Sequence, residues 1–258
     1  MIGTGPGSSD HMSRRAVDLL EKADTVAGYT TYLDLIKEQI SHKKTIATGM
    51  TKEVERVERA VDQALSGTTC ALVSGGDPGI YAMAGLVFEL CEKKGIPLVR
   101  YGSPLSGKSA PRTLELEIVP GIPALSAGAS ILGAPLTHDF AAISLSDLLT
   151  PWETIEKRLA AAASADFVIA LYNPKSKKRD WQLSRAKEII MEHRDGDTCT
   201  GIVTSAMREN QQVTVVPLRE LDQVEVGMQT IVFIGNTASV AYLGFMYTPR
   251  GYSGKYNF

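Results

Sequence analysis

The sequence is poor in cysteine, in histidine and in net charge. Its three cysteines, Cys70, Cys91 and Cys199, are odd in number and far apart, which argues against a disulfide framework and a structural zinc site. The four histidines are scattered, without a helical pair and an attendant carboxylate, so we expect no protein-bound metal. The 27 Lys and Arg residues nearly balance the 29 Asp and Glu residues, and we expect no nucleic-acid partner.

A long uninterrupted hydrophobic run and a basic, apolar leader are also missing. The uncharged run 118–137 contains three prolines and three glycines, which favours a turn, a helix and a second turn over a membrane span. The first residues lack the pattern of a secretory signal. We therefore expect a cytoplasmic protein without a membrane partner.

The residues that are present indicate a folded α/β protein. Hydrophobic residues make up 44% of the 258-residue chain, enough for a sizeable core. Before residue 120 the hydrophobic pattern alternates between helix and strand periods, which predicts a largely parallel sheet with helices on both faces. We expect helices over 13–24, 51–66 and 80–94, with Thr51 as the cap of the second, and strands over 69–74, 96–101 and 114–119.

Proline and glycine clusters near residue 120 divide the chain into an N-terminal domain, 1–119, and a C-terminal domain, 120–258. The second half is predicted to be α/β or α+β, and its pattern leaves the strand order open. A small-residue helix should lie between Pro123 and Gly133. Further strands are expected over 140–145, 166–172, 199–204, 212–217 and 229–234, and helices over 151–163 and 180–193.

Three glycine-rich segments lie where a strand gives way to another element: Gly3–Ser8, Ser74–Tyr81 and Val119–Ala124. The carboxyl ends of strands in open α/β sheets are the usual place for ligands, and glycine lets the backbone approach one closely. The segment Gly102–Ser109 matches the P-loop pattern, but Pro111 and a predicted strand follow it where a P-loop requires a helix. A basic surface loop is the simpler interpretation of that segment.

The glycine segments together resemble those of a known family. Gly5-Pro6-Gly7, the run from Ser74 to Tyr81, and Val119-Pro-Gly-Ile122 occur in the order and spacing of the tetrapyrrole (uroporphyrinogen and precorrin) methyltransferases. The resemblance extends over essentially the whole chain. Longer segments look like the precorrin-3B C17-methyltransferase branch: Val26–Tyr29, His138–Phe140, Ile143–Trp152, Tyr172–Pro174 and Thr248–Tyr252.

The resemblance implies a two-domain tetrapyrrole methylase-like fold with a mostly parallel N-terminal sheet and a mixed C-terminal sheet. It also implies S-adenosylmethionine as cofactor, bound in the cleft between the domains and released as S-adenosylhomocysteine, and a homodimer. The implied activity is methyl transfer to C17 of precorrin-3B or its cobalt form, coupled to ring contraction, in cobalamin biosynthesis. By matching position the cofactor site should include Pro6, Gly75, Gly76, Asp77, Ile80, Pro123, Ala124, Tyr172, Asn173, Ala206, Asn236 and Thr237.

Methyl transfer needs alignment more than acid–base groups, whereas ring contraction requires proton movement. His138 and Asp139 are candidates for that acid–base chemistry, and a structural turn is an equally good interpretation of the pair. The substrate of the family carries many carboxylates, which cationic side chains would bind. Our candidates for substrate binding are Lys108, Arg112, Lys175 and Arg250.

Several other functions remain open from the sequence. Within the family, the glycine segments do not distinguish methylation of C17 from methylation of another ring carbon or of uroporphyrinogen. Outside it stand a P-loop nucleotide hydrolase and a non-catalytic tetrapyrrole carrier, which would not need the cofactor segments. The sequence does not tell a cobalt-containing substrate from a metal-free one.

Overall fold

The computed structural model describes residues 1–103 and 113–257 and divides into two compact units. Unit 1 is Met1–Pro123 and unit 2 is Ala124–Phe258. Each unit has its own sheet and its own hydrophobic core, and the two are described separately below.

The sheet of unit 1 is entirely parallel in its four main strands. Their order is β1 (Ile2–Gly3), β4 (Cys70–Ser74), β2 (Thr25–Tyr29) and β3 (Lys44–Thr48). A separate parallel pair is formed by β5 (Leu98–Arg100) and β6 (Leu114–Leu116). The prediction of a mostly parallel N-terminal sheet is confirmed.

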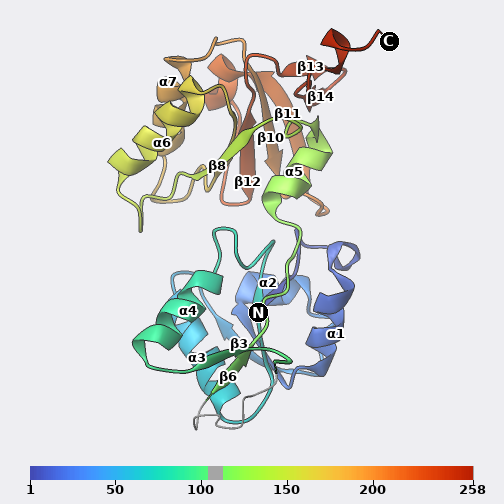
Figure 1. The fold of residues 1–258 in the computed structure, drawn as a ribbon, viewed down its shortest axis with the longest axis vertical. Helices are drawn as coiled ribbons and strands as arrows, with labels where there is room; N and C mark the ends of the chain where they lie inside the picture. Colours follow the sequence, from blue (N-terminus) through green and yellow to red (C-terminus); the bar gives the residue numbers. More distant parts are fainter. Residues whose placement is uncertain (104–112, 258) are drawn as a thin grey trace. The chain divides into compact units, whose positions relative to one another are not determined.

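Helices cover both faces of this sheet, because successive residues of a buried strand point to opposite sides. Ala27 and Leu72 pack in one core with α3 (Glu53–Leu65) and α4 (Ala84–Lys93). Their neighbours Val26 and Val73 pack in a second core with α1 (Arg14–Lys22) and α2 (Thr30–Leu35). Figure 1 shows α3 and α4 on one side of unit 1 and α1 on the other. A short 3₁₀ helix, Ser9–His11, precedes α1.

Two local predictions in unit 1 are wrong. The N-cap of α3 is Lys52, which makes no side-chain cap bond, and Thr51 instead adopts a left-handed backbone conformation with φ of 63°. Helix α4 begins at Ala84 and not at residue 80, because Tyr81 also has a positive φ, 51°, which a right-handed helix excludes. The segment before α4 is a turn, held by a hydrogen bond from the Ala84 N–H to the Pro78 carbonyl.

The sheet of unit 2 is mixed, as predicted. Strands β8 and β9 are parallel, and the other three pairs are antiparallel. The order is β11 (Gln212–Pro217), β10 (Cys199–Thr204), β12 (Thr230–Ile234), β9 (Val168–Tyr172) and β8 (Phe140–Ser144). A second, small sheet has the order β13 (Val240–Tyr242), β14 (Phe245–Tyr247) and β7 (Gly133–Ala134).

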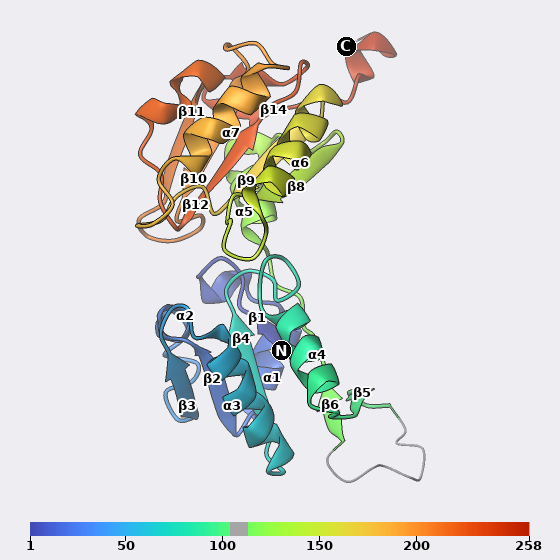
Figure 2. The ribbon, with the colours of Figure 1, turned by 90° about the vertical axis from the view of Figure 1, so that its left-hand side faces the viewer.

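Helices cover both faces of the main sheet of unit 2 as well. In Figure 2, α6 (Trp152–Ser164) and α7 (Gln182–Met191) lie in front of the sheet. They share a core with alternate strand residues such as Leu171 and Val232. On the other face α5 (Ala124–Leu132) packs on Phe233. The 3₁₀ helices of this unit are Leu218–Gln223 and Tyr252–Gly254. No helix in residues 1–103 or 113–257 combines the length and apolar character needed to cross a bilayer.

The packing of α5 on the main sheet of unit 2 can be tested by mutation. Phe233 is fully buried there, whereas Phe140 is 45% exposed at the start of β8. Phe233→Ala should lower the free energy of unfolding by about 3–5 kcal/mol, because it removes buried apolar surface and leaves a cavity. Phe140→Ala is the control and should cost less than about 1 kcal/mol. Urea unfolding followed by circular dichroism measures both, and equal effects would contradict this packing.

Candidate functional site

Three backbone segments of unit 1 meet beyond the ends of β1 and β4. The Gly3 N–H donates to the Val119 carbonyl at 3.0 Å, so the first segment contacts the chain that follows β6. Gly5 and Gly76 exchange two hydrogen bonds, at 3.2 and 2.7 Å, which join the first segment to the second. Because β1 and β4 are parallel neighbours, this contact lies at the carboxyl edge of the sheet, where open α/β folds bind ligands.

Glycine is required at this meeting point. A Cβ atom on Gly121 would overlap the carbonyl oxygen of Gly76, and one on Gly3 would lie 2.6 Å from the Gly121 nitrogen. Gly5 and Gly76 also have positive φ angles, 70° and 65°. Side chains at these positions would push the segments apart, so the glycines serve a close backbone approach.

Asp77 fastens the second segment to the third. One carboxylate oxygen accepts a hydrogen bond from the Gly79 N–H at 2.7 Å, and the other accepts one from the Gly121 N–H at 3.1 Å. The ring of Tyr32 supports the same segment from the side, since a Cβ on Gly75 would lie 2.6 Å from it. Ile80 is 36% exposed at the end of the segment. The sequence-predicted residues of unit 1 from Pro6 to Ile80 therefore belong to one connected loop cluster.

A second group of predicted residues lies at one edge of the unit 2 sheet. The hydroxyl of Tyr172, at the end of β9, accepts a hydrogen bond from the Leu125 N–H in the first turn of α5 at 2.9 Å. Asn173 has a φ of 52° and its side-chain amide donates to the Ser144 hydroxyl at 2.9 Å. Strands β9 and β10 run in the same direction, because β12 is antiparallel to both. Ala206, which follows β10, therefore lies at the same edge, and the exposed Lys175 follows Asn173.

The remaining predicted residues of unit 2 lie at the opposite edge. Strand β12 is antiparallel to β9, so Asn236 and Thr237 follow its end beside the beginning of β9. His138 and Asp139 directly precede β8, which is parallel to β9, and they lie at the same end. The length of β9, about 13 Å at about 3.3 Å per residue, separates this edge from Tyr172. Unit 2 therefore does not bring all its predicted site residues together.

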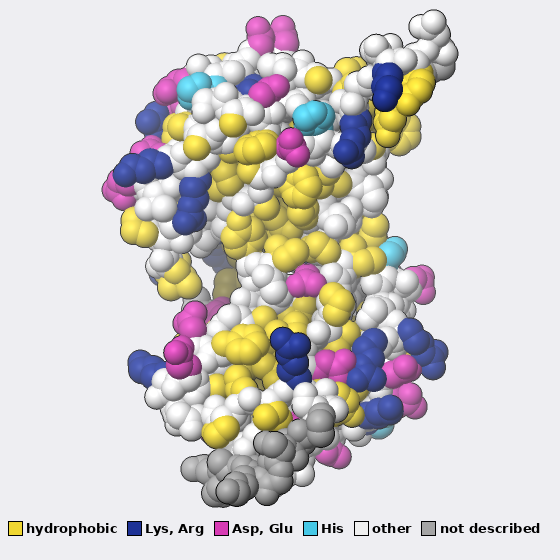
Figure 3. Space-filling model, viewed as in Figure 1, with side chains coloured by type: hydrophobic (Ala, Val, Ile, Leu, Met, Phe, Trp, Pro, Cys, Tyr) yellow, Lys and Arg dark blue, Asp and Glu magenta, His cyan; other side chains and the backbone are white. Residues whose placement is uncertain are grey.

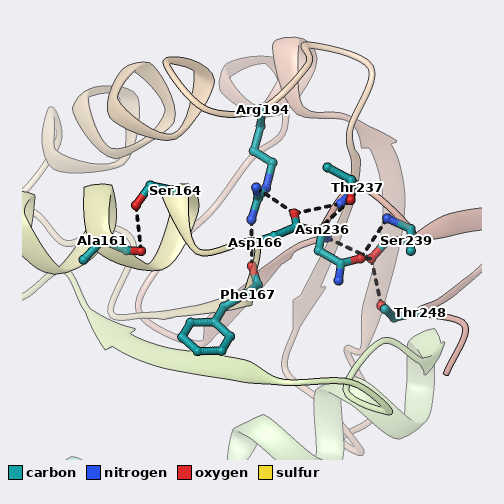
Figure 4. A network of polar contacts seen from close by, with 10 residues as sticks. Ala161, Ser164, Asp166, Phe167, Arg194, Asn236, Thr237, Ser239 and Thr248 are labelled. Carbon is teal, nitrogen blue, oxygen red and sulfur yellow. Dashed lines mark hydrogen bonds and ion pairs between the residues drawn. The ribbon is translucent and has the colours of Figure 1, made fainter.

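The side-chain oxygen of Asn236 and the backbone N–H and hydroxyl of Thr237 hold the chain itself (Figure 4). The Asp166 carboxylate accepts hydrogen bonds from the backbone N–H and the hydroxyl of Thr237, at 3.1 and 2.6 Å, and pairs with Arg194 at 2.7 Å. The side-chain oxygen of Asn236 accepts from Ser239, whose hydroxyl contacts that of Thr248 at 2.7 Å. This network ties the start of β9 to the segment between β12 and β13.

His138 and Asp139 converge only weakly. The Nδ1 atom of His138 accepts a hydrogen bond from the backbone N–H of Asp139 at 2.9 Å and lies 3.9 Å from its carboxylate. Both side chains are well exposed, at 48% and 79%. The pair has the geometry of a surface turn leading into β8.

Of the predicted cationic residues, Lys108 and Arg112 lie outside the described residues, as does most of the P-loop-like segment. Arg250 is exposed beyond β14. Among the residues that the structure describes, no three His, Cys, Asp or Glu side chains form a group that could hold a metal ion.

Two further arginines at these edges were not predicted. Arg56 is on the inward face of α3 with Val57 and Ala60, and Arg179 precedes α7. Both are at least nine-tenths buried, and burial lowers the pKa of both guanidinium groups. The available signal for Arg56 is a basic residue next to the apolar stripe of an amphipathic helix.

The comparison that decides the family is a match of residues 1–222 to the model of the "Tetrapyrrole (Corrin/Porphyrin) Methylases". The chain belongs to the tetrapyrrole methylase family. This confirms the family and the two-domain fold expected from the glycine segments.

Individual tetrapyrrole methylases match nearly the full chain. A Salmonella typhimurium protein named "Probable cobalt-factor III C(17)-methyltransferase" is 43% identical over 98% of both chains. The "Cobalt-factor III methyltransferase" of Priestia megaterium is 45% identical over 99% of this chain, which spans only 45% of that longer protein. A crystal structure of "the methyltransferase CobJ" matches with a TM-score of 0.83 and 35% identity, covering 96% of this chain and 98% of the other.

Because the three segments of the loop cluster approach so closely, adding one methyl group at Gly121 should strongly lower the stability of the protein. Gly121→Ala should lower the free energy of unfolding by about 3 kcal/mol or more, because the new Cβ meets the backbone of Gly76. Gly85→Ala is the matched control: nothing lies within 4 Å of its Cβ position at the start of α4, so the change should be neutral or slightly stabilising. Thermal and urea unfolding compare the two, and a neutral Gly121→Ala would argue against the close approach of the three segments.

Proposed function

We propose that this protein transfers a methyl group from S-adenosylmethionine to C17 of cobalt-factor III in cobalamin biosynthesis. The observation that carries the proposal is the 43% identity to the Salmonella protein over 98% of both chains. The name of the Priestia protein also favours the cobalt-containing substrate over metal-free precorrin-3B. We propose that methyl transfer is coupled to ring contraction, as the sequence resemblance implies.

In unit 1 the proposed donor site is the loop cluster with Pro6, Gly75, Gly76, Asp77 and Ile80. The residues fit such a ligand, because a partly exposed backbone at the carboxyl edge offers polar groups to an adenosine and an amino acid. The Asp77 carboxylate adds a negative charge, which favours a sulfonium cation. Pro123 and Ala124 are the last two residues of the third segment, at the boundary of the two units, and belong to the same proposed set.

In unit 2 the structure supports Tyr172, Asn173 and Ala206 as donor-site candidates, because one sheet edge carries all three. Asn236 and Thr237 were proposed with them from the sequence. Their place at the other edge, and the use of their polar atoms within the chain, give them a structural role in addition. We retain Tyr172, Asn173 and Ala206 as the better supported part of the set.

The donor supplies a methyl group already activated on sulfur. What the chain must do is fix the direction of that methyl group, since displacement at carbon requires the attacking and leaving atoms in line. The glycine contacts and the two bonds of Asp77 hold the loop cluster in one conformation before the ligand arrives. Preorganisation of this kind lowers the entropic cost of alignment.

We further propose a cytoplasmic homodimer with the tetrapyrrole as its small-molecule partner. Figure 3 shows hydrophobic side chains gathered on the visible face of unit 2. The β13–β14 hairpin exposes Tyr242, Leu243 and Phe245 at 62%, 79% and 57%, a concentration of apolar surface typical of a protein interface. Lys108, Arg112, Lys175 and Arg250 stay proposed contacts for substrate carboxylates.

The proposed activity predicts methyl transfer by the purified protein. With S-adenosylmethionine labelled on its methyl group, the label should enter cobalt-factor III, and carbon NMR should place it on C17. Metal-free precorrin-3B in a parallel reaction tests the choice of substrate, and uroporphyrinogen is the control for a different ring position. Label on another carbon, or no transfer with donor binding intact, would contradict the proposal.

The proposed acid–base role of His138 and Asp139 predicts a separation of two activities. His138→Ala should leave the affinity for S-adenosylhomocysteine unchanged, because the side chain is at the far edge from Tyr172. It should slow ring contraction by about a hundredfold, the usual contribution of general acid–base catalysis. His42→Ala, at another scattered histidine, is the control. Unchanged formation of the contracted product would leave His138 with only its role in the turn.

A further inference from the structure

Among the residues that the structure describes, three arginines are buried: Arg56, Arg179 and Arg194 are 3%, 9% and 7% exposed. A guanidinium group remains charged inside a protein, and a buried charge is costly unless an opposite charge accompanies it. Arg194 has such a partner, since Asp166 lies 2.7 Å away. Within residues 1–103 and 113–257, no carboxylate lies within 4.0 Å of Arg56 or Arg179.

Arg56 donates only to neutral acceptors. Its Nε contacts the Thr48 hydroxyl at 2.7 Å, and one terminal nitrogen contacts the Gly49 carbonyl at 2.9 Å. The other terminal nitrogen contacts the thioether sulfur of Met83 at 3.1 Å, a weak acceptor on a flexible side chain. The group also lies 5.8 Å from the centre of the Tyr29 ring. Glu53 acts on it only from beyond ion-pair distance.

Arg179 repeats this arrangement in unit 2. Its Nε donates to the Asn173 carbonyl at 3.0 Å, and one terminal nitrogen lies 3.4 Å from the Ser146 hydroxyl. The second terminal nitrogen again faces a thioether, that of Met228 at 3.9 Å, and Met228 is 46% exposed. Asp147 influences the guanidinium from a longer distance and accepts a hydrogen bond from Gln182.

Arg56 and Arg179 also differ from Arg194 in their position on the sheets. Tyr29 and Thr48 are the last residues of β2 and β3, and Gly49 follows β3. Met83 lies in the loop after β4, so Arg56 is at the carboxyl edge that carries the loop cluster. Tyr29 links it to the cluster, because its ring packs edge-on against Tyr32 beside Gly75. Arg179 lies at the edge of unit 2 with Asn173, whereas Arg194 lies at the opposite edge.

We propose that Arg56 and Arg179 each bind a carboxylate side chain of the tetrapyrrole substrate. The inference rests on the proposed function and names two binding residues for it. Each guanidinium keeps donors that no strong acceptor uses, and a carboxylate satisfies them in a bidentate, charge-assisted pair. Met228 and Met83 now contact these donors through their thioethers. Met228 is 46% exposed and moves aside at little cost, whereas Met83 is 7% exposed in the core beside α4 and must shift for a carboxylate to reach Arg56. The acetate and propionate groups of the macrocycle then supply the counter-ions that the described residues lack.

A structural role for the same arginines makes different predictions. An arginine that holds the fold through its neutral partners stabilises the protein, and its loss lowers the free energy of unfolding. An arginine kept for an absent counter-ion contributes little stability or none, and its loss weakens substrate binding instead. Stability and the Michaelis constant, measured on the same variants, therefore separate the two roles.

The test uses Arg56→Met and Arg179→Met in the full chain. We expect each to raise KM for cobalt-factor III about tenfold to a hundredfold, the range of one charge-assisted pair. Affinity for S-adenosylhomocysteine, by calorimetry, should change less than about twofold, and the urea midpoint should stay the same or rise. Arg56→Gln and Arg179→Gln keep a neutral donor without the charge, and they should raise KM similarly even where a methionine variant does not fold.

Matched control variants separate the effect of a buried, unpaired arginine from that of an exposed cation and from that of a buried ion pair. Arg59→Met removes an exposed cation on the same helix as Arg56, and Lys178→Met removes one next to Arg179, so neither should change KM. Arg194→Met breaks a buried ion pair and should lower the urea midpoint without raising KM.

Unchanged KM in the methionine variants, or wild-type KM in the glutamine variants, overturns the proposal, whatever happens to stability. If the wild type methylates no corrin precursor, the proposed function fails and this inference fails with it. If the wild type methylates cobalt-factor III and the Arg56 and Arg179 variants have the same KM as the wild type, the inference alone fails.

Discussion

The proposed activity depends on the close backbone contact of three segments at the carboxyl edge of the unit 1 sheet. Gly5 and Gly76 exchange hydrogen bonds there, and Gly121 approaches so closely that no side chain fits. Asp77 then joins the second segment to the third with both carboxylate oxygens. The parallel order of β1 and β4 makes this possible, because it brings two strand ends to one place. The proposed donor would meet a surface whose shape is fixed by hydrogen bonds within the chain.

Charge is the second constraint, and it follows from the substrate we propose. A chain of net charge −2 that binds a polycarboxylate must place cations where the macrocycle lies. Arg56 and Arg179 lie at the two sheet edges that carry the proposed donor-site residues, and they lack carboxylate partners within the described residues. In our proposal, burial of such a charge sacrifices stability for a preorganised binding group, a compromise that functional sites commonly show.

Much of the fold could be predicted from local pattern. Strands β10 and β11 have the predicted bounds, because both segments are rich in β-branched residues, which favour strands. Strands β2 and β3 were missed: Thr25–Tyr29 contains a glycine, and Lys44–Thr48 is an edge strand with exposed residues. The loop cluster was predictable from its glycines. The division of unit 2 into two edges was not, since it depends on β12 being antiparallel to β9. The burial of Arg56 was not predicted, because the identity of a charged residue in the sequence does not show whether its side chain is buried.

The central claim is that the loop cluster of unit 1 binds the methyl donor. A crystal structure of the protein with S-adenosylhomocysteine tests it most directly. Our account predicts that the ligand contacts the backbone from Gly75 to Ile80 and the segment around Pro6, with Asp77 still bonded to Gly121. Ligand bound elsewhere, with these segments unchanged and free of contact, would contradict the account.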